Sequence, residues 1–186
     1  MFFNEDFVCL AIPKCAARAM HEWTRNYRAT LWPGTLHHIT DTKVAYEGRL
    51  VFMVVRNPYS RALSIWKHVR DKHGYQKPIE WLMMELTGRK KLSINPLFKP
   101  SQLGYLKRHK FPIEDVDVKY IKLENLDEGL KQLPFVVDYK PPDVWGKSDT
   151  DSAQEIESLS RKAILLINKW AYEDFNTLGY DLRSGL

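Results

Sequence analysis

Two continuous apolar runs, at residues 7–12 and 50–55, most constrain how this chain can fold, because each leads into a cation and a helix-like pattern. An apolar run without alternation is typical of a strand that is buried on both faces of a parallel sheet. Lys14 follows the first run and Arg56 follows the second. A strand–loop–helix junction directs backbone N–H groups and the positive end of a helix toward one point, which favours anions. The sequence therefore predicts two anion sites, suited to one ligand with phosphate-like groups at both ends.

A third apolar run and several helical patterns continue this alternation. The third predicted strand covers residues 118–123. Helical spacing of apolar residues predicts helices at residues 16–27, 58–73, 78–86, 126–133 and 153–176. Asn57 is expected to cap the second of these helices and Gly74 to end it. Strands that alternate with helices predict an α/β fold: a single domain over residues 1–186 with a mainly parallel central sheet flanked by helices. In such sheets ligands bind beyond the carboxyl ends of the strands, where both cations fall.

The composition is that of a globular protein with a basic surface. Hydrophobic residues make up 44% of the chain and charged residues 27%, and the net charge is +5 with a pI near 9.1. A basic surface attracts anions such as nucleotides and acidic glycans. The basic residues are scattered among acids rather than gathered in a stripe with interleaved aromatic residues, so no nucleic-acid partner is expected.

The cysteines and the first residues predict a cytoplasmic protein. Cys9 and Cys15 are too few for a disulfide framework, and no His/Cys spacing suggests a zinc site. Residues 1–6 carry acidic side chains where a signal peptide has basic ones. No apolar run approaches the roughly 20 residues that cross a bilayer, so no membrane insertion is expected.

Five segments, in this order, resemble a known family. They are the loop at 13–19, the Arg-Asn-Pro-Tyr-Ser-Arg segment with a serine behind it at 56–64, and residues 120–126, 147–148 and 172–180. In these segments the chain resembles the sulfotransferases that use 3′-phosphoadenosine 5′-phosphosulfate, above all the carbohydrate (glycan) branch. The resemblance implies a P-loop-NTPase-like sulfotransferase fold. It also implies in-line transfer of a sulfuryl group to a hydroxyl or amine of a small-molecule or glycan acceptor. The implied cofactor is 3′-phosphoadenosine 5′-phosphosulfate, its product is adenosine 3′,5′-bisphosphate, and no metal is needed.

The resemblance also implies roles for individual residues. The loop that would hold the 5′ end of the cofactor consists of Pro13, Lys14, Cys15, Ala16, Ala17, Arg18 and Ala19. Lys14 would be catalytic, because an ammonium at this point stabilises the negative charge that develops on the leaving phosphate. Arg56 and Ser64 would hold the 3′ phosphate. Lys147 and Ser148 would close over the cofactor or the acceptor from a loop.

Two positions depart from the pattern of that family. The family usually has Gly where this chain has Ala16, and Thr where it has Arg18. The hydroxyl that would donate a hydrogen bond to the 5′ phosphate is therefore absent. Arg18 could replace it with a bidentate contact, or it could point to solvent or toward an acidic acceptor.

The acceptor hydroxyl calls for a general base, and histidine is the usual residue for this role near neutral pH. His37 and His38 lie between the first predicted helix and the second predicted strand. In the resembling glycan sulfotransferases a catalytic histidine often falls in this interval. His38 is slightly favoured, and the interpretation in which neither histidine is catalytic stays open. Glu22 and Glu47 are the carboxylate alternatives.

Two other functions stay open at this point. One is a degenerate, non-catalytic protein that binds adenosine 3′,5′-bisphosphate. The departures from the family pattern at Ala16 and Arg18 favour this function. The other is a P-loop kinase-like phosphotransferase, which needs a Gly-x-x-x-x-Gly-Lys-Ser/Thr motif and a magnesium site. The chain lacks that motif.

Overall fold

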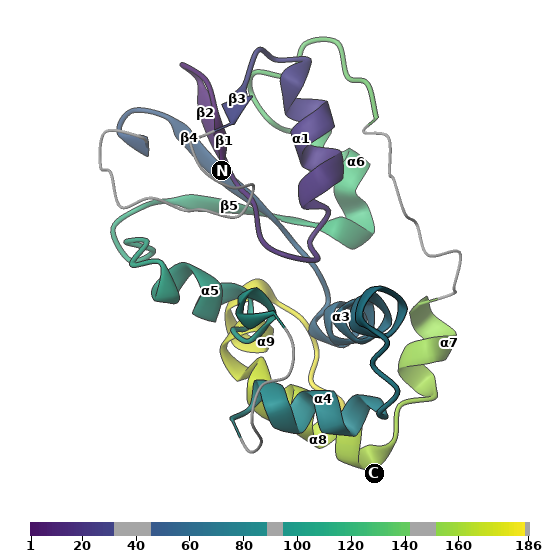
Figure 1. The fold of residues 1–186 in the computed structure, drawn as a ribbon. Coiled ribbons are helices and arrows are strands. Elements are labelled where there is room, and N and C mark those ends of the chain that lie inside the picture. The colour runs from purple at the N-terminus through teal and green to yellow at the C-terminus, as the bar shows by residue number, and fades with distance from the viewer. Residues whose placement is uncertain (32–45, 89–94, 142–151, 185–186) are drawn as a thin grey trace. The chain divides into compact units, whose positions relative to one another are not determined.

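The chain forms two compact units, which we call the sheet unit and the helical unit (Figure 1). The computed structural model describes residues 1–31, 46–88, 95–141 and 152–184. The sheet unit comprises Met1–Arg56 and Leu106–Lys147, and the helical unit comprises Asn57–Tyr105 and Ser148–Leu186. The expectation of a single domain over the whole chain stays a prediction.

Short strands and helices account for most of the described residues. The strands are β1 (Phe2–Phe3), β2 (Phe7–Leu10), β3 (Thr30–Leu31), β4 (Leu50–Val55) and β5 (Val118–Lys122). The helices of the sheet unit are α1 (Ala17–Arg25) and α6 (Leu126–Lys131). The remaining helices are α3 (Pro58–His73), α4 (Ile79–Leu86), α5 (Gln102–Arg108), α7 (Ser152–Glu157), α8 (Arg161–Trp170) and α9 (Tyr172–Leu178), with single 3-10 turns η1 (Pro96–Phe98) and η2 (Leu123–Asn125).

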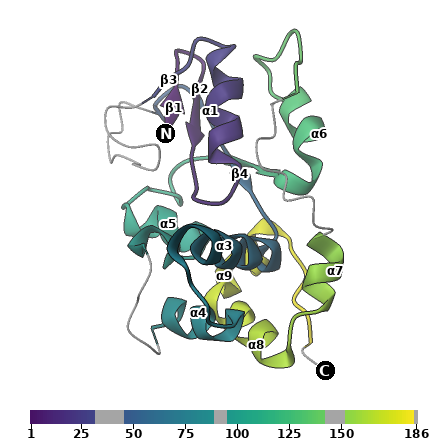
Figure 2. The ribbon, with the colours of Figure 1, turned by 45° about the vertical axis from the view of Figure 1, so that its right-hand side comes forward.

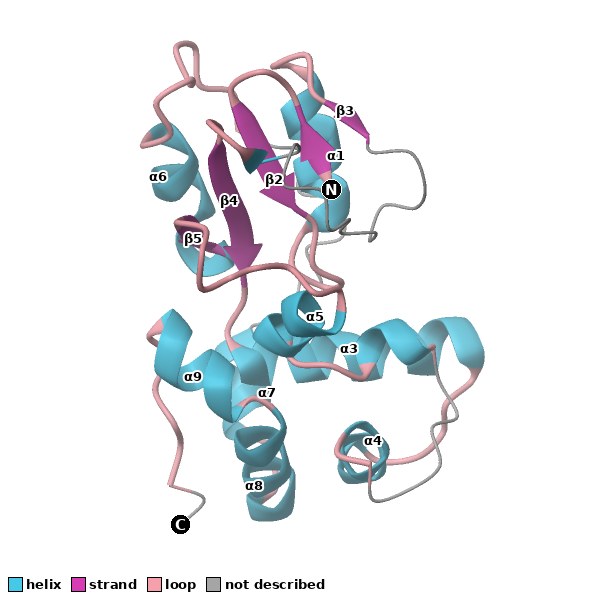
Figure 3. Cartoon of the chain, turned by 90° about the vertical axis from the view of Figure 1, so that its left-hand side faces the viewer, coloured by secondary structure: helices cyan, strands magenta, loops and turns pink. Residues whose placement is uncertain are grey.

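The sheet has the strand order β3-β1-β2-β4-β5 (Figure 3). Strands β2, β4 and β5 pair in parallel, which confirms the predicted α/β class and the three predicted strands. The prediction of a mainly parallel sheet is wrong for its other half, because β1 pairs antiparallel with both β2 and β3. The sheet is therefore mixed, and the finer expectation of a P-loop-NTPase-like sulfotransferase fold stays a prediction.

Asn4 makes the turn that brings β1 back along β2. Its side-chain oxygen accepts hydrogen bonds from the backbone N–H groups of Asp6 and Phe7, both at 2.9 Å. A side chain that bonds its own backbone two or three residues on replaces a backbone turn. The sequence analysis missed β1 and β3 because a strand of two residues is too short to show an alternating pattern.

Helices α1 and α6 cover one face of the sheet (Figure 2). Their apolar stripes meet the side chains that β4 and β5 turn toward them; the buried residues shared by these elements are Ala17, Met20, Trp23, Phe52, Val54, Ile121, Leu126 and Leu130. Trp23 is 1% exposed, and its indole N–H donates a hydrogen bond to the Lys140 carbonyl at 2.8 Å. Burial of this side chain holds α1, the helix that follows Lys14, against the sheet. Truncation of a buried tryptophan to alanine costs about 3–5 kcal/mol.

The helical unit is built around α3, whose two ends match the sequence prediction. The Asn57 side chain accepts hydrogen bonds from the N–H groups of Tyr59 and Ser60, and Pro58 occupies the first turn. Gly74 ends the helix in the left-handed conformation, with φ at 64°. The core of this unit comes from α3, α4, α8 and α9, and includes Tyr59, Ile65, Leu82, Ile167 and Phe175.

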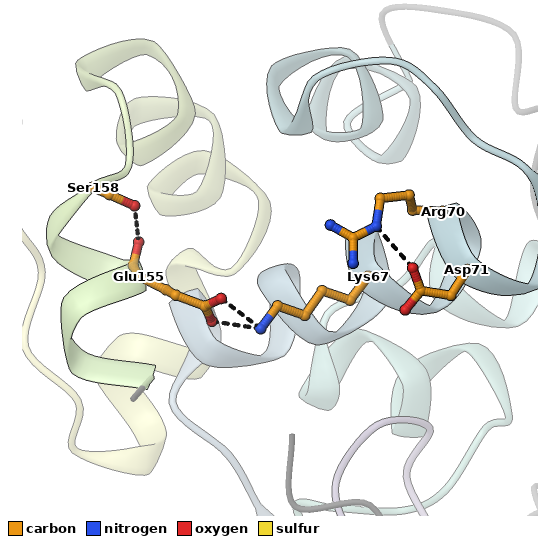
Figure 4. Close-up of polar contacts among 5 residues, drawn as sticks. All are labelled: Lys67, Arg70, Asp71, Glu155 and Ser158. Carbon is orange, nitrogen blue, oxygen red and sulfur yellow. Dashed lines mark hydrogen bonds and ion pairs between the residues drawn. The ribbon is translucent and has the colours of Figure 1, made fainter. Parts of the chain in front are cut away.

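The predicted helix at 153–176 is wrong as a single element, because three helices occupy this stretch. The Ser158 hydroxyl bonds back to the Glu155 carbonyl at the end of α7, and the Ser160 side chain accepts a hydrogen bond from the Ala163 N–H at the start of α8. A serine hydroxyl that competes for backbone groups ends one helix and caps the next. Lys67 on α3 holds α7 through both carboxylate oxygens of Glu155, at 2.6 and 2.7 Å (Figure 4).

Helix α5 lies in the stretch at 88–112, to which the sequence assigned no element. Its first N–H groups, those of Gln102 and Leu103, donate to the carboxylate of Asp174 on α9 at 2.7 and 2.9 Å. Asp174 is fully buried. The residue that caps this helix lies some 70 positions further along the chain than the helix itself. No local sequence pattern therefore predicts the helix.

None of the helices in the described ranges is long and apolar enough to cross a membrane.

Candidate functional site

The loop after β2 has the closing hydrogen bond and the one positive φ that a type II turn requires, with Lys14 at its strained position. The Cys15 N–H donates to the Ile12 carbonyl at 3.2 Å, which closes a four-residue turn with Pro13 in second place. Lys14 is in third place with φ at 68°, where type II turns usually have glycine. A left-handed backbone costs an L-residue roughly 1–2 kcal/mol.

A second left-handed residue, Ala16, lies between this turn and α1. Its φ is 56°, and no side chain caps the helix that begins after it. The first N–H groups of a helix have no partner within the helix, and loops with left-handed residues turn successive N–H groups to one side. The Met20 N–H donates to the Ala16 carbonyl at 2.9 Å, which joins α1 to this loop. The loop thus has the backbone form of an anion cradle at a helix N-terminus.

Arg56 follows β4 at the level of this loop. β2 and β4 pair in parallel with Leu10 opposite Met53, and three residues beyond this pair come Pro13 and Arg56. Neighbouring strands lie about 4.8 Å apart, so the chain segments that leave them start side by side. The sheet register therefore brings the two predicted anion sites to one edge.

The pKa of Lys14 depends on the two nearby arginines. Burial, the Arg56 guanidinium and the Arg18 guanidinium, in that order, lower the pKa of Lys14 from 10.5 to about 8. The only opposing influence is the Cys15 thiol, and no carboxylate of the described residues pairs with Lys14. We call Lys14, Arg18 and Arg56 the cation cluster. Because like charges and burial both penalise an ammonium, an anion bound beside Lys14 would favour its charged form.

The side chains of the cluster differ in exposure. Lys14 and Arg56 are half-buried, whereas Arg18, on the first turn of α1, is exposed. The sequence left three positions open for Arg18: a contact with the phosphate, an orientation to solvent, and an orientation toward an acidic acceptor. Its charge acts on Lys14, as the first requires, and its exposure is compatible with the other two. The other residues of the loop, Pro13, Cys15, Ala17 and Ala19, are buried and pack beneath it.

The remaining candidate residues lie in the helical unit or outside the described residues. Ser64 lies on α3 in the helical unit and is half-buried. The candidate bases and the closing loop lie outside the described residues: His37, His38, Lys147 and Ser148.

Both carboxylate alternatives for the base are exposed. Glu22 lies on α1, where the Arg25 guanidinium is 3.7 Å from its carboxylate. Glu47 precedes β4.

The sequence analysis missed the backbone strain of the loop. Pro13 before Lys14 is a signal for a type II turn, and the family's glycine at the position of Ala16 is a signal for a positive φ. Neither signal reveals how far burial and two guanidinium groups lower the pKa of an ammonium. Within the described part of the chain, no three histidine, cysteine or acidic side chains gather into a group that could hold a metal.

Comparison with known proteins finds no family model, no curated protein and no solved structure that matches this chain.

Proposed function

We propose that this protein transfers a sulfuryl group from 3′-phosphoadenosine 5′-phosphosulfate to a hydroxyl or amine of an acceptor, possible acceptors being small molecules and carbohydrates. The observation that carries the proposal is the cation cluster, in which Lys14 and Arg56, at neighbouring strand ends, act on each other electrostatically. A nucleotide with phosphate groups at its 3′ and 5′ ends offers an anion to each of these two cations. The left-handed loop residues Lys14 and Ala16 support the same ligand, because they suit a phosphate-binding backbone.

Each residue of the cluster has a distinct part in this proposal. The cofactor supplies an activated sulfuryl group whose leaving group is a phosphate. The Lys14 ammonium donates a hydrogen bond to the bridging oxygen, where negative charge develops as the bond breaks. Arg56 holds the 3′ phosphate, and Arg18 takes the place of the hydroxyl that the family's threonine would supply. His38, or His37, accepts the proton of the attacking hydroxyl.

A binding experiment tests the nucleotide part of the proposal. Calorimetric titration with adenosine 3′,5′-bisphosphate and with adenosine 5′-monophosphate, each at two salt concentrations, measures what the 3′ phosphate contributes. We expect Arg56→Met to weaken the bisphosphate and to leave the monophosphate nearly unchanged. Equal binding of the two nucleotides by the wild-type chain contradicts the proposed site.

A transfer assay tests the chemistry. Incubation with a sulfur-labelled donor and a panel of hydroxyl and amine acceptors is expected to yield a labelled product. Removing a donor of this kind from a transition state costs about 10²–10³ in turnover, so Lys14→Met should reduce the rate by that factor while bisphosphate binding falls less. Lys110→Met is the matched control, because Lys110 is an exposed lysine that also has a positive φ, at 54°, but no place in the cluster. A rate that Lys14→Met leaves unchanged contradicts the role of this residue.

Non-catalytic nucleotide binding is the second candidate, and one observation favours it. Ala16 holds, with a Cβ atom, a left-handed position at which the resembling family has glycine. A loop under this strain can still bind an anion without placing it for transfer. Tight binding of adenosine 3′,5′-bisphosphate without transfer to any acceptor would select this function.

A P-loop kinase-like phosphotransferase makes the opposite prediction about metal. Sulfuryl transfer in the resembling family needs no metal, so EDTA should leave the rate unchanged. Loss of transfer on addition of EDTA would favour the phosphotransferase.

A further inference from the structure

Lys14 combines the properties that turn a lysine side chain into a nucleophile. Lysines act as nucleophiles when burial or a neighbouring cation favours the free amine over the ammonium. Lys14 is half-buried, and two guanidinium groups, of Arg56 and Arg18, act on it. No carboxylate of the described residues pairs with Lys14, and the Cys15 thiol, the last of the causes that act on its pKa, offsets only part of what burial and the two guanidinium groups do.

The geometry of the loop adds a binding site for an anion beside the amine. The turn that places Lys14 in a left-handed conformation also ends at the N-terminus of α1, and the sheet register brings Arg56 to the same edge. A phosphate held by the two guanidinium groups would lie next to the amine. We propose that Lys14 is a covalent capture site for small aldehydes that carry a phosphate group, with which its amine forms an imine.

The reaction balances without an oxidant or a reductant. The Lys14 nitrogen attacks the aldehyde carbon, and a proton passes from nitrogen to the former carbonyl oxygen to give a carbinolamine. Loss of one water molecule then leaves a carbon–nitrogen double bond. The phosphate takes no part in the bonds that change; it holds the aldehyde at the amine and raises its effective concentration.

The fraction of free amine indicates the size of the effect. With a pKa of about 8, Lys14 is roughly 10% free amine at pH 7, against about 0.03% for a lysine with the ordinary value of 10.5. A less basic amine is also a weaker nucleophile, which offsets part of this difference. We therefore expect Lys14 to react at least about tenfold faster than an ordinary exposed lysine.

Lys110 is a control within the same unit. It has a positive φ of 54°, as Lys14 does, but it is exposed and lies just after the end of α5 rather than in the loop after β2. A difference in reaction rate between the two lysines therefore arises from the surroundings of Lys14 in the cation cluster and not from its backbone conformation.

Reductive labelling of the whole chain tests the proposal. The protein is treated at pH 7 with pyridoxal 5′-phosphate and cyanoborohydride, which fixes the imine, and the labelled peptides are quantified by mass spectrometry. We expect Lys14 to be labelled at least tenfold faster than Lys110, and this preference to fall at least fivefold when pyridoxal, which lacks the phosphate, is used. Equal rates at the two lysines, or a preference that does not need the phosphate, overturn the proposal.

Arg56→Met provides a second test, because it removes both an anion contact and a charge that depresses the pKa of Lys14. We expect the ratio of the labelling rate of Lys14 to that of Lys110 to fall in this variant and in Arg18→Met. If Arg56→Met fails to fold, as judged by its circular dichroism, the comparison of the two aldehydes on the wild-type chain still decides the matter.

The inference shares the cation cluster with the proposed function but does not rest on sulfuryl transfer. Labelling in the presence of adenosine 3′,5′-bisphosphate separates the two. Selective labelling that the bisphosphate does not prevent supports covalent capture and contradicts the nucleotide site. Binding of the bisphosphate without selective labelling of Lys14 supports the nucleotide site and overturns the capture proposal.

Discussion

The Lys14 ammonium and the Arg56 guanidinium, which follow different strands of one parallel pair, lie near enough for Arg56 to lower the pKa of Lys14. Burial and the neighbouring guanidinium groups together disfavour the Lys14 ammonium in the folded chain. A strongly shifted pKa at the end of a strand is a pattern that functional sites share with structural ion pairs. The four predictions below follow from this pair, from the loop that carries it and from a buried carboxylate in the helical unit.

Replacing Lys14 by methionine should stabilise the folded protein at pH 7. The pKa of Lys14 is lower in the folded state, about 8, than the ordinary 10.5, so below pH 8 the folded chain must hold an unfavourable ammonium. The full shift is discounted because the side chain is partly exposed and solvent screens its charge, which leaves a gain of about 1 kcal/mol in the free energy of unfolding. Urea denaturation at pH 7 measures this gain.

The pH dependence of that gain checks its cause. Between about pH 8 and pH 10.5 the unfolded state binds more protons at Lys14 than the folded state, so the stability of the wild-type chain rises relative to the variant. The advantage of Lys14→Met should therefore be complete below about pH 8 and absent above about pH 10.5. Lys110→Met, at an exposed lysine with the same sign of φ, should show no such trend. A gain for Lys14→Met that is independent of pH would contradict the electrostatic explanation.

Binding of adenosine 3′,5′-bisphosphate should weaken as the pH rises through about 8. The Lys14 amine has to be protonated to attract the ligand, and the bound phosphate raises the pKa of Lys14 again. Binding at pH 8 to 9 should thus take up a proton from the buffer, and affinity should fall by up to about tenfold per pH unit above 8. Calorimetry in two buffers of different ionisation enthalpy measures the proton uptake. Lys14→Met should abolish it, and uptake that persists in this variant would assign the proton to another group.

Ala16→Gly should stabilise the loop. Ala16 has a φ of 56°, a conformation that glycine adopts without steric cost. The steric strain that this change removes exceeds the cost of the extra backbone entropy that glycine loses on folding. The free energy of unfolding should therefore rise by about 0.5–1 kcal/mol. Ala17→Gly is the matched control, because Ala17 is the first residue of α1 and glycine there should destabilise the chain. Destabilisation by both changes would show that the left-handed backbone at Ala16 is not strained in solution.

Asp174→Asn should destabilise the helical unit by about 2 kcal/mol, because the buried carboxylate accepts hydrogen bonds from the N–H groups of Gln102 and Leu103. An asparagine keeps one acceptor oxygen and brings an NH₂ group that cannot accept. The neighbouring change Glu173→Gln, at an exposed side chain, should have little effect. Equal and small effects of the two changes, measured by urea denaturation, would contradict the capping role of Asp174.

Local signals account for the elements that the sequence analysis placed correctly. Helix α3 was predicted with both its ends, because Asn57, Pro58 and Gly74 are adjacent to the helix that they delimit. Strands β2 and β4 were predicted because burial on both faces requires an unbroken apolar run.

The errors share a physical cause, which is that the deciding partner lies far away in the sequence or that the signal is too short. The break between α7 and α8 depends on serine hydroxyls that outweigh a continuous apolar spacing. Helix α5 depends on Asp174, and β1 depends on pairing with β2 and β3. The roles proposed for Ser64, His38 and Lys147 stay predictions.

By itself the sequence determined that Lys14 and Arg56 each follow a strand and precede a helix, because those positions depend only on neighbouring residues. Only the tertiary structure decided that the two charges act on each other, since this depends on the parallel register of β2 and β4 and on the burial of Lys14. An electrostatic interaction depends on distance through space and on the surrounding medium, and neither is a property of a sequence interval.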